Sequence, residues 1–375
     1  MSEIIDVTLT PHESYLDLYK DFYEKYELLD IVFPEDPRFS KKNLKPKGER
    51  KCRFCGLKFP EVSFKSYSHL LSELIGNKDL FTDFECDTCN NKFSKLENDL
   101  ASYLGISRTI QRVSSKKGVP GFKSAGKKLK AKSKSYLGND FIVISTDDFE
   151  NNVIDVLDRE KGIINVKYVK NPYTPLSVYK VLLKWGLSLF NDKLLPFYKY
   201  AFMFLNNAVD LKGAAVYGYR LPFHANLLPR AYIFQKRDLT SSNFTHVIAF
   251  GFQNYFICIP MPLCANDFKL NGTEVKLAAC PPLFTQFEPY SNAEVAPFIE
   301  QMEGNVQVKG VEESFFFQMD PEQLRRAAAY DYNTDTHIEG VYKPEKLKAL
   351  VFMRDGIEFG KDEIRDFVQS ILEDQ

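Results

Sequence analysis

The amino-acid sequence predicts an α+β fold with a small cysteine-bearing module and a larger C-terminal domain. Four of the seven cysteines form two C-x-x-C pairs, at positions 52–55 and 86–89. Runs of alternating apolar and polar residues recur across 214–261, which is typical of an antiparallel sheet. A segment with apolar residues at helical spacing, 171–192, precedes them and is entered through Pro175.

The length and composition exclude several classes of protein. A chain of 375 residues suggests two or three domains, at roughly 100–200 residues each. Hydrophobic residues make up 44% of it, which excludes a disordered, collagen-like or coiled-coil chain. Seven cysteines are too few for a disulfide-stapled secreted scaffold.

We expect a soluble, cytoplasmic protein without a membrane span. The N-terminal residues are acidic and lack the apolar stretch of an export signal. The longest uncharged stretch, 247–265, contains Gln253, Asn254 and two prolines and is rich in aromatic and β-branched residues. We interpret it as one or two buried strands rather than a transmembrane helix.

The order of these features predicts three parts. Residues 1–51 contain an acidic amphipathic helix, expected over 15–29, and a basic lead-in over 37–51 with seven bases and one acid. Residues 52–140 contain the cysteine module and a second basic segment. Residues 141–375 are expected to form a regulatory or recognition domain of the α+β class, with a mainly antiparallel sheet. Its late helices are expected at 321–331, 345–355 and 363–375.

The charge is unevenly placed along the chain. Residues 100–139 hold ten bases and no acid, so the remaining 39 bases face 50 acids and leave a net −11 elsewhere. Glycines and a proline in this segment favour a loop or an irregular hairpin over a long helix. Clustered bases neutralise phosphates, which predicts nucleic-acid binding; a solvated linker is the alternative. The expected contacts are Arg108, Arg112, Lys116, Lys117, Lys127 and Lys128.

The two C-x-x-C pairs predict a structural zinc site. Cys52, Cys55, Cys86 and Cys89 supply four thiolates from two tight turns, which is the ligand set of a closed tetrahedral centre. Such a site performs no chemistry; it stabilises a module that is too small for a core of its own. Any catalysis must come from side chains that the zinc site holds in place.

Three polar residues lie near the cysteines in the sequence. His69 lies between the pairs and is expected on a strand or hairpin. Asn90 follows the second pair at the start of a predicted helix that ends at Gly105, because glycine is a favoured helix stop. Glu97 comes two helical turns after Asn90 and is expected on the same helix face.

These residues resemble the HNH endonucleases, in particular the branch that carries C-x-x-C zinc knuckles and a ββα-metal fold. The matching pieces are CRFCG at 52–56, His69 followed by LLSELIGN, and FECDTCNNKFSKLEND at 84–99. The resemblance covers about residues 52–105. It implies that His69 is the general base that activates water, and that Asn90 is a ligand of a catalytic divalent cation.

The chain departs from the family pattern at two positions. Ser68 stands where many members have an acid or histidine ligand, and Ser72 stands where many have proline. We therefore expect Glu97 to supply the missing oxygen ligand beside Asn90. Oxygen ligands suit Mg²⁺ or Mn²⁺, and a neutral imidazole can take a proton near pH 7. Asn77 and Asp83 are candidates for the family's middle Asn, which orients the base.

The resulting hypothesis is a metal-dependent endonuclease that hydrolyses DNA phosphodiester bonds, with RNA as the less favoured substrate. Family architecture suggests a bacterial restriction or anti-phage defence setting, in which residues 141–375 control or target the nuclease. The sequence leaves open a small-molecule or protein activator and a homo-oligomer. The alternative hypothesis is a zinc-ribbon protein that binds nucleic acid without cutting it.

Overall fold

The computed structural model describes most of the chain in two compact units. The described residues are 15–115, 118–146, 153–158, 160–221, 227–270, 278–281, 283, 296–318, 329–331, 336–338, 349–352 and 366. Unit 1 comprises 1–101 and 173–307, and unit 2 comprises 102–172 and 308–375. Each unit therefore combines two stretches that are distant in the sequence, and its boundaries differ from those expected at 51 and 140.

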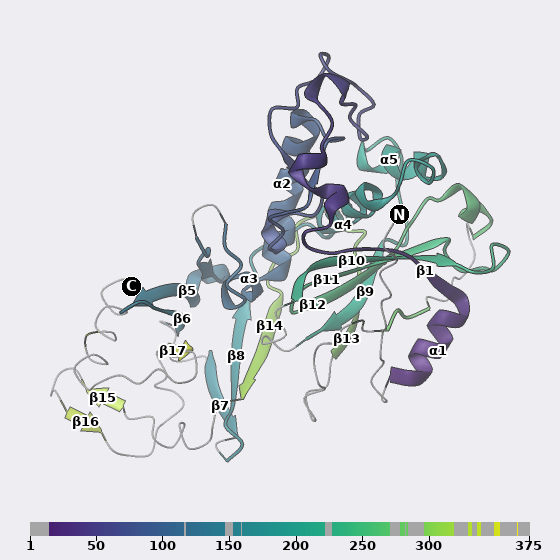
Figure 1. The fold of residues 1–375 in the computed structure, drawn as a ribbon. Helices are drawn as coiled ribbons and strands as arrows, with labels where there is room; N and C mark the ends of the chain where they lie inside the picture. The colour runs from purple at the N-terminus through teal and green to yellow at the C-terminus, as the bar shows by residue number, and fades with distance from the viewer. Residues whose placement is uncertain are drawn as a thin grey trace. The chain divides into compact units, whose positions relative to one another are not determined.

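The described secondary structure mixes helices with antiparallel strands, which confirms the α+β class (Figure 1). The α-helices are α1 Leu16–Lys25, α2 Asp87–Leu104, α3 Ser107–Ile110, α4 Pro175–Leu189 and α5 Lys199–Leu205. The strands of unit 1 are β1 Tyr26–Val32, β2 Ser68–His69, β3 Phe81–Thr82, β9 Ala215–Arg220, β10 Leu227–Lys236, β11 His246–Gln253, β12 Tyr255–Pro260 and β13 Ala296–Gln301. The strands of unit 2 are β4 Phe122–Lys123, β5 Leu129–Tyr136, β6 Asn139–Thr146, β7 Ile154–Asp158, β8 Ile163–Val169, β14 Glu312–Gln318, β15 Ala329–Asp331, β16 Thr336–Ile338 and β17 Ala349–Phe352.

A six-stranded antiparallel sheet forms the centre of unit 1, in the order β1-β10-β11-β12-β9-β13. This confirms the antiparallel sheet expected from the alternating runs. The uncharged stretch becomes β11 and β12, in which every residue is buried. No helix in the described part of the chain is long and apolar enough to cross a membrane.

Helix α4 covers one face of this sheet. The Trp185 ring lies 5.6 Å from the Phe250 ring and 6.1 Å from the Phe252 ring, both on β11. Gly186 allows close packing, because a Cβ there would lie 2.7 Å from the sulfur of Met261. The helix begins at Pro175, as expected from the fixed φ of a proline in a first turn.

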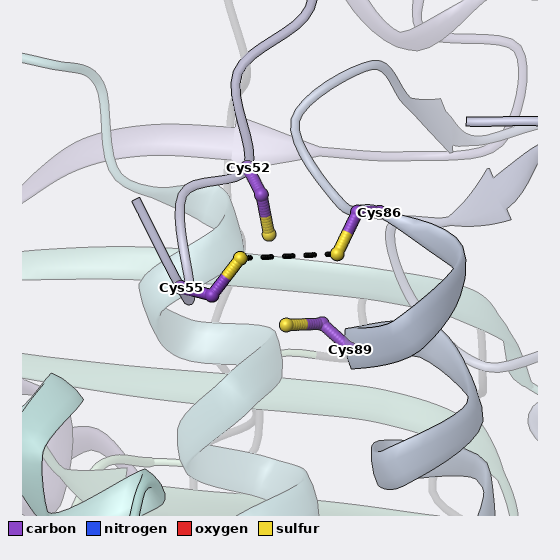
Figure 2. Close-up of side chains that lie close together, drawn as sticks. All are labelled: Cys52, Cys55, Cys86 and Cys89. Carbon is purple, nitrogen blue, oxygen red and sulfur yellow. Dashed lines mark hydrogen bonds between the residues drawn. The ribbon is translucent and has the colours of Figure 1, made fainter. Parts of the chain in front are cut away.

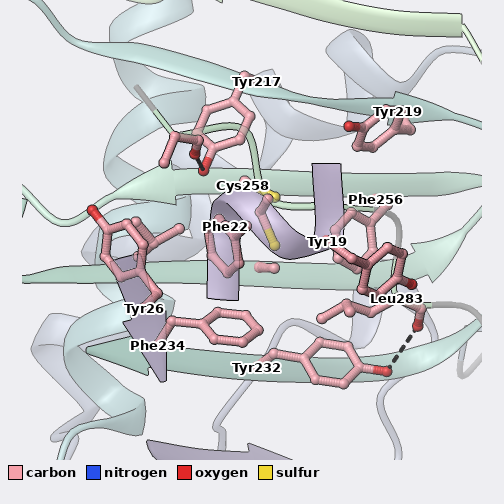
Figure 3. Close-up of a cluster of buried hydrophobic side chains, with 14 of the residues drawn as sticks. Tyr19, Phe22, Tyr26, Tyr217, Tyr219, Tyr232, Phe234, Phe256, Cys258 and Leu283 are labelled. Atoms are coloured by element: carbon pink, nitrogen blue, oxygen red, sulfur yellow. Dashed lines mark hydrogen bonds between the residues drawn. The ribbon is translucent and has the colours of Figure 1, made fainter. Parts of the chain in front are cut away.

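Helix α1 covers the opposite face, where its side chains join a tyrosine-rich cluster with those of the sheet (Figure 3). Phe22 of α1 stacks on Tyr26 and meets Phe234 of β10 edge-on. The helix expected over 15–29 is therefore too long: it ends at Lys25, and the chain continues as β1. Pairing with β10 satisfies the backbone groups of this segment and overrides its helical periodicity.

Unit 2 contains smaller sheets, with orders β17-β6-β5-β4, β14-β8-β7 and β15-β16. Strands β5 and β6 form a hairpin around Leu137 and Gly138, which both have positive φ. The sequence predicts a loop or an irregular hairpin rather than a long helix for the basic segment, and residues 129–139 of it belong to a hairpin whose register is regular. The helix expected over 345–355 is wrong at 349–352, which pairs with β6 as β17. Residues 329–331 are likewise a strand, and the other residues of those two predicted helices lie outside the described part.

Candidate metal centre and its neighbouring histidine

The four predicted zinc ligands come together in unit 1 (Figure 2). The sulfur atoms of Cys52, Cys55, Cys86 and Cys89 all lie within 4.8 Å of one another. The Cys55 and Cys86 sulfurs are 3.9 Å apart. A tetrahedral ion with ligands at 2.3 Å places its sulfurs about 3.8 Å apart, so the cluster fits zinc.

Local backbone bonds shape the first cysteine pair. The N–H of Cys52 donates to Leu57 O over 2.7 Å, and the N–H of Gly56 donates to Cys52 O over 2.9 Å. Gly56 has a φ of 77°, which a residue with a side chain rarely adopts. The second pair lies at the start of α2, where Cys86 and Cys89 are brought together by the first turn.

The cluster favours the ionised form of one thiol. The pKa of Cys52 is lowered, first because Cys89 donates a hydrogen bond to its sulfur and then because nearby backbone N–H groups do the same. The thiolate is the form that binds a metal. The pKa values of Cys86 and Cys89 are raised, that of Cys86 first by burial and that of Cys89 first by its hydrogen bond to Cys52, so it is the donor set and its spacing that agree with a structural zinc ion.

The cysteine module is anchored to α4 by Arg53, which lies inside the first knuckle. Its guanidinium donates to the carbonyls of Leu187, Ser188 and Phe190 at the end of α4, over 2.9–3.0 Å. These carbonyls have no partner within the helix, so Arg53 satisfies them. A second anchor joins the module to α5, where Lys92 donates to Leu205 O over 2.9 Å.

A short hairpin and a helix hold the candidate catalytic residues. Strands β2 and β3 pair Ser68 with Thr82 and His69 with Phe81, and α2 follows them in the chain. This places His69 on a strand, as expected. The expected start of the helix is three residues late, because α2 begins at Asp87 and Asn90 is its fourth residue.

The hairpin loop is fixed by Asn77, one of the two candidates for the middle Asn. Its side-chain N–H₂ donates to Leu71 O over 2.6 Å and to Leu80 O over 3.0 Å. Its oxygen accepts from the N–H of Leu80 over 2.9 Å. Asn77 thereby ties the chain two residues after His69 to the start of β3. The other candidate, Asp83, accepts from the N–H of Lys45.

His69 is partly exposed and has a carboxylate nearby. Its Nε2 lies 4.0 Å from Oε2 of Glu73, and its ring lies 4.7 Å from the Phe81 ring. The side chain is 24% exposed, so solvent reaches it. Sequence reasoning missed Glu73, because a four-residue spacing brings side chains together on a helix and His69 was expected on a strand or hairpin.

Glu97 belongs to a buried polar cluster beneath the hairpin. Its Oε2 accepts from the hydroxyl of Ser72 over 2.7 Å. Burial raises the pKa of Glu97, and the positive charge of Lys184 works against that rise. Lys184, on α4, forms an ion pair of 2.7 Å with Glu85, and burial also raises the pKa of Glu85.

Lys184, Glu85 and Arg53 were not singled out from the sequence. Lys184 is the lone charge in the apolar run VLLKWGLSL at 181–189, and that isolation is the signal that could have found it. Glu85 and Arg53 carry no comparable signal. Their partners are distant in the chain, so only the tertiary structure reveals them.

The described residues contain one group of three or more His, Cys, Asp or Glu side chains close enough to hold a metal, namely the four cysteines. Asn90 and Glu97 both lie on α2, and Glu97 is bound by Ser72. The role of Asn90 and Glu97 as cation ligands stays a prediction.

The predicted nucleic-acid contacts lie in unit 2, whereas His69 and the cysteines lie in unit 1. Lys127 and Lys128 are exposed, Arg108 is half-buried, and Arg112 donates to Asp140 O over 2.6 Å. Lys116 and Lys117 lie outside the described residues. Whether this segment binds nucleic acid stays a prediction.

Comparisons with known proteins yield no relative. No family model matches the chain. No curated protein and no solved structure matches it either.

Proposed function

We propose that this protein is a metal-dependent endonuclease of the HNH type that cleaves DNA. The observation that carries the proposal is a partly exposed histidine on the first strand of a strand–strand–helix unit stapled by four cysteines. The order of zinc knuckle, histidine hairpin and helix is the one implied by the family resemblance. In this proposal the zinc is structural, and His69 performs the chemistry.

His69 acts as the general base. Its imidazole takes a proton from the attacking water and becomes positively charged. The carboxylate of Glu73, 4.0 Å from Nε2, stabilises that charge. Asn77 fixes the loop that follows and so keeps β2 in register with β3.

A Mg²⁺ or Mn²⁺ ion would be held by oxygen ligands from Asn90 and Glu97. Such an ion supplies charge for the scissile phosphate and the leaving oxygen. The hydrogen bond from Ser72 orients the Glu97 carboxylate toward the hairpin. The bases of 100–139 would bind the phosphates of the flanking DNA.

The direct test replaces His69 with alanine. General-base catalysis contributes about 10²–10⁴ in rate, so His69→Ala should slow Mg²⁺- or Mn²⁺-dependent plasmid nicking at least about a hundredfold. Zinc content and DNA binding should stay at wild-type levels. His246→Gln is the matched control, because His246 is buried outside the module and should leave nicking unchanged.

The alternative is a zinc-ribbon protein that binds nucleic acid without cutting it. One observation favours it: among the described residues, the cysteines are the only group gathered as metal ligands. If the wild-type protein nicks no DNA with any divalent cation, also when extract is added as a source of activator, the alternative is correct. Parallel assays with labelled RNA decide the substrate.

The rest of the chain would control or target the nuclease. The proposed setting is bacterial restriction or anti-phage defence. The nuclease would be activated by a small molecule or a protein. Assembly into a homo-oligomer is one way in which such an activator could act. This part of the proposal rests on family architecture alone.

A further inference from the structure

The basic lead-in, residues 37–51, packs against the hairpin that carries His69. The ammonium of Lys41 lies 4.3 Å from the centre of the Phe81 ring on β3. The N–H of Lys45 donates to the Asp83 carboxylate over 2.9 Å, just after β3. Arg50 then donates to Lys45 O over 2.8 Å and fixes the lead-in from its other end. The lead-in and His69 therefore belong to the same part of unit 1.

An exposed aromatic ring lies at this junction. Tyr67 directly precedes β2 and is 52% exposed. The Lys41 ammonium lies 5.4 Å from the centre of its ring. Tyr67 and His69 both contact the Phe81 ring, with centres 6.2 Å and 4.7 Å away. The exposed Tyr67 and the candidate base His69 thus pack against the same Phe81 ring.

The charge around Tyr67 favours an anionic ligand. The exposed bases of the lead-in are Arg38, Lys41, Lys42, Lys45, Lys47 and Lys51, of which Arg38 is paired with Asp30 and Asp36; Lys65 precedes Tyr67 by two residues. These lysines outnumber the two carboxylates bonded to the same segments, Asp83, which accepts from the N–H of Lys45, and Asp87, which accepts from the N–H groups of Lys65 and Ser66. A ligand that carries both a flat ring and a phosphate matches an exposed tyrosine beside lysines.

We propose that Tyr67 and Lys41 bind an unpaired nucleotide of the DNA strand that is cut at His69. The inference rests on the proposed function and names its substrate class: single-stranded DNA or a duplex with an unpaired segment. A base stacks on the phenol ring of Tyr67, and Lys41 contacts the adjoining phosphate. Inside an intact duplex both faces of each base are covered by neighbours, so Tyr67 can stack only on a base that has left the helix.

The test measures binding by the full-length, zinc-loaded His69→Ala protein, so that no DNA is consumed. The probes are a fluorescent oligo-dT strand and a perfect duplex of the same length. Tyr67→Ala should weaken oligo-dT binding about five- to a hundredfold, the range for loss of one stacked base. Lys41→Ala should weaken it and lower its salt dependence, whereas Tyr67→Phe should bind like its parent.

Two controls separate a local site from general surface effects. Tyr200→Ala removes another exposed tyrosine of unit 1, and Lys20→Ala removes an exposed lysine of α1. Both should bind oligo-dT like the parent. Equal losses in Tyr67→Ala and Tyr200→Ala, or a loss confined to the duplex, would overturn the inference. The inference would also be overturned if an oligo-rU probe bound more tightly than oligo-dT and if Tyr67→Ala weakened the binding of oligo-rU but not of oligo-dT.

This inference and the proposed function can fail separately. If the wild-type protein never nicks DNA while oligo-dT binding depends on Tyr67, the nuclease proposal fails and the nucleotide site stands. If His69→Ala abolishes nicking while Tyr67→Ala binds and cuts normally, the nuclease proposal stands and the nucleotide site fails.

Discussion

The cysteine module and the six-stranded sheet of unit 1 are stabilised in different ways. The sheet buries aromatic and aliphatic side chains on both faces, so its stability is spread over many contacts. The module also buries apolar side chains, among them Leu70, Leu71 and Phe93, but it adds a few specific polar groups: four thiols, the guanidinium of Arg53 and the ion pair of Lys184 with Glu85. Single substitutions should therefore damage the module far more selectively than the sheet.

The largest effect is expected from removing a zinc ligand. Cys86→Ser should lose the single zinc and unfold the module around 52–105, because structural zinc contributes about 10–16 kcal/mol in small zinc-finger peptides. Metal analysis and hydrogen exchange would measure both effects, and β10–β12 should keep their protection. Cys258→Ser, which alters a buried cysteine of the sheet, should retain zinc. A folded Cys86→Ser module without zinc would refute the predicted metal centre.

The next effect tests the buried ion pair that joins the module to α4. Lys184→Met leaves Glu85 buried without its partner and should destabilise the protein by about 3–5 kcal/mol in denaturant unfolding. Lys180→Met, on the same helix but bonded to Asn207 at the surface, should cost less than about 1 kcal/mol. Adding Glu85→Gln should restore part of the loss. Equal costs at positions 184 and 180 would show that the ion pair is not an anchor.

A smaller effect, on the pH dependence of stability, is expected from His246 in the sheet. Burial lowers the pKa of His246, at the start of β11, from 6.5 to about 4; the charge of Asp267 opposes the shift and that of Lys236 adds to it. Tyr198 hydrogen-bonds its Nδ1 over 2.7 Å. The folded protein thus holds His246 neutral, while the unfolded chain takes up a proton between pH 6.5 and 4.

The corresponding stability is complete above pH 6.5 and is lost as the pH falls through about 4, to a total of about 3 kcal/mol. Urea unfolding of the wild type and of His246→Gln at a series of pH values measures it, and the variant should lack this part of the acid sensitivity. Parallel pH curves for the two proteins would contradict the prediction.

Much of the fold was predictable from local patterns. The runs at 163–169 and 246–260 are strands because apolar β-branched and aromatic residues favour extended backbone. The helix at 175–189 was predictable from Pro175 and its apolar spacing. The errors came where a distant strand decided the outcome: β10 converts 26–32 to a strand, and β6 does the same for 349–352.

The residues of the candidate site likewise divide into those that the sequence predicted and those that it did not. The four cysteines were predictable because their spacing is itself the chemical signal, and His69 was noticeable only because it lies between them. Glu73, Lys184 and Arg53 were missed, since their roles arise from what they face in space. The basic segment at 100–139 drew attention by its charge alone, yet its bases belong to unit 2, whereas the lysines of the lead-in share unit 1 with His69.

The sequence by itself determined the ligands of the metal centre and the local shape of most strands and helices. Each C-x-x-C pair and each regular element depends on neighbours within a few residues, although the two pairs, with Cys55 and Cys86 31 residues apart, meet only in the folded unit. Only the tertiary structure decided that α4 supports the histidine hairpin through Lys184 and that Lys41 lies over the Phe81 ring. Those contacts join residues far apart in the chain, and burial and Coulomb attraction select them only when the whole unit is assembled.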